Sequence, residues 1–80
     1  MRGCPFYFDV RDGDTLVPDD EGLELPSIKA ARDEATRALA EMAKDALPQS
    51  FIRELAIEVR GETKESLLRT RLKFETERLR

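Results

Sequence analysis

The chain has 80 residues, enough for one compact domain and too few for two. Its apolar fraction of 40% is too high for an intrinsically disordered chain, and its net charge of −3 disfavours non-specific coating of DNA. No apolar run approaches the ~20 residues that span a bilayer, and no apolar signal-peptide region follows Arg2, so we expect a cytoplasmic protein without membrane contact.

The first hairpin is predicted by alternation followed by a turn. Residues 6–11 place Phe6, Phe8 and Val10 on one side of an extended strand, as expected for a half-buried strand. Asp12-Gly13 suits a tight hairpin turn, and residues 15–17 form the returning strand, which Pro18 either ends or confines to a sheet edge. Residues 23–25 are interpreted as a short extended lead into the next element.

A long amphipathic helix is predicted after Pro26. Ser27 is suited to cap it, and Pro48 stops it at or before Leu47. Its apolar stripe is rich in alanine. Because small residues let a helix approach a sheet closely, we expect the remaining volume to be filled by Phe6, Phe8 and Phe74.

The second hairpin joins two alternating strands, residues 54–60 and 68–77. With Thr63-Lys64 as a two-residue turn, four cross-strand pairs follow: Val59 with Leu68, Leu55 with Leu72, Glu58 with Arg69, and Glu54 with Lys73. Together these elements predict an α+β fold, a two-layer ββαββ domain. Its four-stranded, mainly antiparallel sheet has the order 2-1-3-4, with one long helix on one face. We expect a single domain over residues 1–80, with residues 1–4 and 77–80 frayed.

Several kinds of chemistry are disfavoured by the residues present. Histidine is absent, and the single cysteine, Cys4, can form no intrachain disulfide. Asp9, Asp12 and Asp14 have roughly the spacing of hard-cation ligands, but they fall in a hairpin and lack the EF-hand glycine and glutamate, so turn chemistry is favoured over a Ca²⁺ or Mg²⁺ site. We therefore expect no enzyme, no cofactor, no metal and no catalytic residue. An unrecognised pair of carboxylates is the one alternative left open.

The predicted outer face of the sheet is the most informative surface. It gathers one aromatic and four basic side chains: Tyr7, Arg60, Arg69, Arg71 and Lys73. Such a strip suits single-stranded nucleic acid, which stacks on aromatic rings and is neutralised by cations. The favoured interpretation is a solvated face with cross-strand ion pairs, because sheet-based RNA readers usually carry two or more aromatic residues.

Two resemblances are carried by short strings of residues. Residues 6–13, 20–26 and 54–60, with the Ala30-Ala31-Arg32 and Glu34-Ala35 segments of the helix, resemble a family of small bacterial proteins described as a domain of unknown function, 6894, which implies no active site. Members tend to have an acidic-Gly turn where this chain has Thr63-Lys64. The Pro18-Asp19 and Gly22 turn before an alanine-rich helix also resembles HicB-type antitoxin domains, although these place three strands before the helix and carry a DNA-binding tail.

The favoured functional hypothesis is a non-enzymatic protein-interaction or regulatory module that binds another protein or itself as a homodimer. Small core size and exposed hairpin edges motivate it. The alternative is a nucleic-acid-associated or HicB-antitoxin-like protein that uses the basic face.

Overall fold

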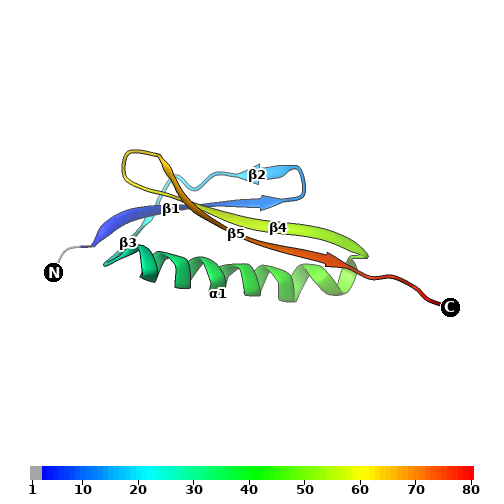
Figure 1. The fold of residues 1–80 in the computed structure, drawn as a ribbon. Coiled ribbons are helices and arrows are strands. Elements are labelled where there is room, and N and C mark those ends of the chain that lie inside the picture. The colour runs from blue at the N-terminus through cyan, green and yellow to red at the C-terminus, as the bar shows by residue number, and fades with distance from the viewer. Residues whose placement is uncertain (1–2) are drawn as a thin grey trace.

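The computed structural model describes residues 3–80 as two layers, a sheet covered on one face by a helix (Figure 1). The elements follow the order β1 (Cys4–Asp12), β2 (Thr15–Val17), β3 (Leu23–Leu25), α1 (Ile28–Ala46), a 3-10 turn (Leu47–Gln49), β4 (Ile52–Arg60) and β5 (Ser66–Glu75). The antiparallel strands have the order β2-β1-β4-β5, and β3 pairs with residues 4–6 of β1. This confirms the predicted α+β fold and strand order.

The sheet has one strand more than predicted. Residues 23–25, expected as an extended lead, pair with β1 as β3, so that three strands precede the helix. A segment of three residues is too short for its alternation to be distinguished from a connection. Of the ends predicted to fray, Met1 and Arg2 lie outside the described residues, Cys4 already belongs to β1, and residues 77–80 follow the last strand. Within residues 3–80, no helix has the length and apolar character that crossing a membrane requires.

Helix α1 packs through a single narrow stripe. Ser27 caps it as predicted, because its Oγ accepts a hydrogen bond from the Ala30 N–H at 3.1 Å. The buried side chains recur at every fourth position and are small: Ala31, Ala35, Leu39 and Ala43. They lie against strand β4, whose Leu55, Ile57 and Val59 are the most completely buried large side chains.

The three phenylalanines predicted to fill the core take different positions. Phe6 is buried and Phe8 is partly buried against the core. Phe74 is only partly covered and lies in an apolar hollow of about 420 Å³ that Ala43, Lys44, Leu47 and Pro48 complete. Phe74, the third residue predicted to fill the core, therefore lies at an open end of the core.

The second hairpin has the predicted body and a different turn. All four predicted pairs are present, Val59 with Leu68, Leu55 with Leu72, Glu58 with Arg69 and Glu54 with Lys73. The turn is longer than two residues, because Lys64 N–H donates to Gly61 O at 3.0 Å and the register shifts between Val59 and Arg60. Lys64 has a φ of 71°, so one left-handed residue and a bulge replace the two positive-φ residues that a two-residue turn needs.

Candidate interaction surface

The five residues predicted to form an interaction face do share the sheet face that is turned away from α1, by strand alternation. Tyr7 of β1 lies opposite Arg60 of β4, while Arg69, Arg71 and Lys73 follow one another on β5. The structure also interleaves them with carboxylates, because Arg69 lies opposite Glu58 and Lys73 opposite Glu54. The face is therefore a mixture of both charges rather than a basic strip.

Arg60 is occupied by contacts within the chain. Its Nε and Nη2 donate to the Asp9 carboxylate at 2.6 and 3.1 Å, and Nη2 also donates to the Asp19 carbonyl at 2.9 Å. Its Cζ lies 5.1 Å from the centroid of the Tyr7 ring, a cation–π distance. Asp9 is only 7% exposed, and the hydrogen bond from Arg60 holds the pKa of its carboxyl below the usual value. This guanidinium is used to neutralise a buried carboxylate.

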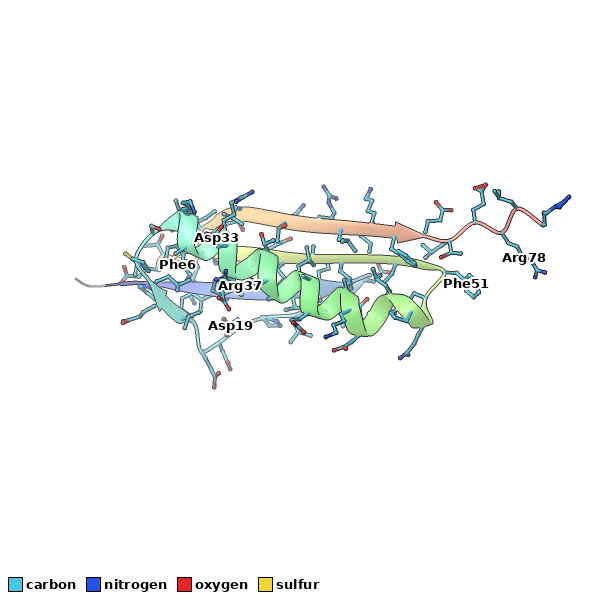
Figure 2. All side chains as sticks on the ribbon, turned by 90° about the horizontal axis from the view of Figure 1, so that it is seen from below. Phe6, Asp19, Asp33, Arg37, Phe51 and Arg78 are labelled. Carbon is cyan, nitrogen blue, oxygen red and sulfur yellow. The ribbon has the colours of Figure 1, made fainter. Side chains whose placement is uncertain are left out.

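Asp19 fastens the loop after β2 to the backbone of β1. Its carboxylate accepts hydrogen bonds from the N–H groups of Phe8, Glu21 and Gly22 at 3.0, 3.0 and 3.2 Å. Burial alone would raise the pKa of Asp19, but these three N–H groups together lower it below its usual value. Phe8 lies between the stretch of β1 that pairs with β3 and the stretch that pairs with β2. The carboxylate thus takes the place of a strand partner, on the side of β1 away from β5 (Figure 2).

This cluster borders a hollow that is lined by residues of both charges. This hollow of about 360 Å³ beside Tyr7 is lined by Arg60 and Lys64 together with the carboxylates of Asp19, Asp20 and Glu62. Of the charged residues in this lining, Asp19 and Arg60 are already hydrogen-bonded within the chain. Among residues 3–80, no three cysteine or carboxylate side chains converge in a manner suited to a metal ion.

Two of the three basic residues of β5, Arg69 and Arg71, lean over β4. Arg69 contacts Glu58 at 2.7 Å, and Arg71 approaches Glu54 at 3.8 Å. Glu58 also receives Arg11 of β1 at 4.0 Å. Such exposed pairs add little stability. They do, however, draw the two guanidinium groups toward the middle of the sheet and away from its β5 edge.

The β5 edge is long and open. β5 has ten residues, and within residues 3–80 no strand pairs with its side away from β4. Thr76 N–H donates to Phe51 O at 2.7 Å, so even-numbered residues direct their backbone groups toward β4. The odd-numbered residues from 69 to 75 therefore direct N–H and C=O groups outward, whereas the bulge reverses this alternation before Leu68, where Glu65 O faces Gly61. Among residues 3–80, the strands on the opposite side of the sheet are the three-residue strands β2 and β3, with Pro18 and the Asp19 loop between them.

Apolar side chains are exposed where β4 begins and β5 ends. Phe51 and Ile52 are each 75% exposed, next to the hollow that contains Phe74. Figure 2 shows Phe51 at this end of the molecule, beside the segment that leads to Arg78. Sequence reasoning did not single out Phe51 and Ile52. The available signal was a pair of adjacent bulky apolar residues that precedes the alternating part of β4.

Comparisons with known proteins give one match. The family model described as a domain of unknown function, DUF6894, matches residues 6–73. No curated protein and no solved structure matches the chain. The resemblance to HicB-type antitoxin domains therefore stays a prediction.

Proposed function

The chain belongs to the DUF6894 family, whose membership brings no activity with it, and we propose from the geometry that it is a protein-interaction module whose β5 edge pairs with a strand of its partner. The single observation that carries this proposal is the ten-residue edge strand with outward N–H and C=O groups. An exposed edge of this length is a template for strand addition.

The side chains around β5 support the same use. The inward-facing Leu68, Leu72 and Phe74 stay partly exposed, whereas Leu55, Ile57 and Val59 on the neighbouring strand are covered by α1. A strand added beside β5 would cover the exposed apolar groups that the single helix leaves open. It would meet little obstruction, because Arg69 and Arg71 lean toward Glu58 and Glu54.

The nucleic-acid alternative has less support. Arg60 is neutralised by Asp9, and the one tyrosine lies under that same guanidinium. Arg69 and Arg71 each face a glutamate. Summed positive field and stacking rings, the two features that single-stranded nucleic acid needs, are therefore both weak on this face.

A proline at position 71 tests the proposal. Arg71→Pro removes one outward N–H and no hydrogen bond to β4, so the sheet should survive while the edge is blocked. Arg71→Ala removes the same side chain and keeps the N–H. In pull-downs from nuclease-treated lysate, read by mass spectrometry, we expect the native chain and Arg71→Ala to retain a protein partner that Arg71→Pro loses.

The outcome is interpretable only for folded variants, which far-ultraviolet circular dichroism checks. Equal retention by all three chains would place the interaction on another surface and contradict the proposal. Recovery that disappears with nuclease would instead favour the nucleic-acid alternative.

A further inference from the structure

The residue order of β5 limits how a second copy of the chain could pair with it. In an antiparallel pair of identical strands, side chains of the same face lie opposite each other, so only every second register is allowed. A register centred on Arg71 places Arg69 opposite Lys73, and one centred on Thr70 places Arg69 opposite Arg71. Like charges directly opposite one another are destabilising. Pairing of two copies through the middle of β5 is therefore disfavoured by charge repulsion.

A register displaced toward the C-terminus has the opposite character. When the pair is centred on Phe74, Lys73 of one copy lies opposite Glu75 of the other, and Arg71 lies opposite Glu77. Two-fold symmetry makes each of these pairs occur twice. Leu72 then lies opposite Thr76, and Phe74 lies opposite itself on the helix side, where aromatic cross-strand pairs add stability.

We propose that the partner of the β5 edge is a second copy of this chain, bound in the antiparallel register centred on Phe74. The inference rests on the proposed use of that edge for strand pairing. This antiparallel pairing joins the two sheets into one continuous sheet and places both helices on the same face. The two hollows beside Phe74 then adjoin each other at the symmetry axis.

The backbone supports this register. Lys73 and Glu75 both direct their N–H and C=O groups outward, so they form a hydrogen-bonded pair across the axis, and Phe74 forms a non-hydrogen-bonded one. Residues 76–80 continue past the end of β5 and project beyond the sheet (Figure 1). Thr76 still bonds to Phe51. In the dimer this projecting segment gains a partner, because it lies along the β5 strand of the other copy.

The exposed apolar residues lie where this interface forms. In the sheet register Ile52 lies opposite Glu75, and Thr76 is bonded to Phe51, so both apolar residues are within two positions of the axis residue. Leu79 of the projecting segment is 83% exposed. Phe51 and Ile52 lie on the β4 side of β5, one strand away from the paired edge, so the register is selected by the charge pattern and the Phe74 pair rather than by these two residues.

Charge reversal tests the register. Glu77 lies beyond the last strand and is exposed, so Glu77→Lys should leave the monomer unchanged. It places a lysine opposite Arg71 twice per dimer, and we expect the dimer dissociation constant from sedimentation velocity to rise about tenfold. Arg71→Glu combined with Glu77→Lys should restore dimerisation. Arg69→Glu combined with Glu77→Lys should not, because rescue by that pair belongs to the register centred on Lys73.

Cysteine cross-linking provides a second, independent measurement. In a Cys4→Ser background, Phe74→Cys faces itself across the axis at a Cα separation of ~4.5 Å, within the range of a disulfide. We expect oxidation to produce a covalent dimer. Thr70→Cys is the matched control, since it lies on the same face and has the same hydrogen-bonding class, and it should stay monomeric.

The possible failures are distinguishable from one another. Cross-linking at position 70 and not at 74, or rescue by Arg69→Glu, would overturn the register. A chain that sediments as a monomer at every concentration and forms no disulfide at position 74 would overturn self-pairing. If that monomer still captured a protein partner that Arg71→Pro loses, the proposed function would stand without this inference. If it captured none, both would fall.

Discussion

On the outer face of the sheet, Tyr7, Asp9, Asp19 and Arg60 form a cluster of mutual contacts. Asp19→Ala is the substitution that tests the contribution of this cluster to stability most directly. The change removes a carboxylate that accepts three backbone N–H groups, one of which belongs to Phe8 in the middle of β1. Glu21 and Gly22 can turn their N–H groups to water, whereas the Phe8 N–H is part-buried. A hydrogen bond to a charged group contributes ~1.5–3 kcal/mol, and a buried donor left without a partner costs a further fraction of this.

The change also removes the repulsion between Asp19 and Asp9 and the attraction between Asp19 and Arg60, two effects of opposite sign. We therefore expect the free energy of unfolding at pH 7 to fall by ~2 kcal/mol. For a chain of this size such a loss lowers the melting temperature by roughly 10 °C. Urea and thermal unfolding followed by circular dichroism measure both quantities. Asp20→Ala is the matched control, because Asp20 is exposed, and it should change stability by less than ~0.5 kcal/mol.

The effect should depend on pH in a direction set by the pKa of Asp19. That pKa is lower in the folded chain than the usual value of 3.8, so the charged carboxylate stabilises the fold above that pH. The stabilisation is lost as the pH falls through the folded pKa. The difference between native and Asp19→Ala chains should thus be constant from neutral pH down to about 5 and narrow below 3.8. Stability equal to that of Asp20→Ala, or a difference that widens in acid, would refute this reasoning.

Two backbone predictions follow from the turns. Gly22→Ala should destabilise the chain by more than ~1 kcal/mol, because position 22 has a φ of 77° and the new Cβ would lie 2.8 Å from the Tyr7 ring. Gly13→Ala has open space around its Cβ and serves as the comparison in thermal unfolding; an equal loss would show that the ring contact is unimportant. Lys64→Gly should raise the free energy of unfolding by up to ~1 kcal/mol, because it relieves a left-handed non-glycine residue. An unchanged or lower urea midpoint would contradict the assignment of strain to Lys64.

The features that the sequence predicts correctly are those fixed by local periodicity. Alternation determines the β4–β5 register, since a slip by one residue would turn Leu55 and Ile57 out of the core. The helix follows from its cap at Ser27 and the stop near Pro48. The features that escaped prediction depend on contacts distant in sequence. The carboxylate of Asp19 looks like part of a polar turn until β1 is placed beside it.

The candidate surface could also be predicted only in part from the sequence. Strand alternation places the five predicted residues on one face, as expected. It does not reveal that Asp9 and Asp19 occupy Arg60, because those contacts span 51 and 41 positions of the chain. The β5 edge itself follows from the predicted strand order 2-1-3-4, which places the fourth strand at the side of the sheet, and the structure confirms that position. The proposed interaction surface is therefore the backbone of the β5 edge and not the side chains of the predicted face.

Hydrogen–deuterium exchange of the β5 amides, resolved by nuclear magnetic resonance, is the most direct test of strand pairing at this edge. In the isolated chain the amides of even-numbered residues 68–74 should be protected by β4, and those of Arg69, Arg71, Lys73 and Glu75 should exchange rapidly. As concentration rises and the edge is paired, the odd-numbered amides from 71 to 75 should become protected as well. Rapid exchange of these amides at every concentration, with and without a captured partner, would contradict the account.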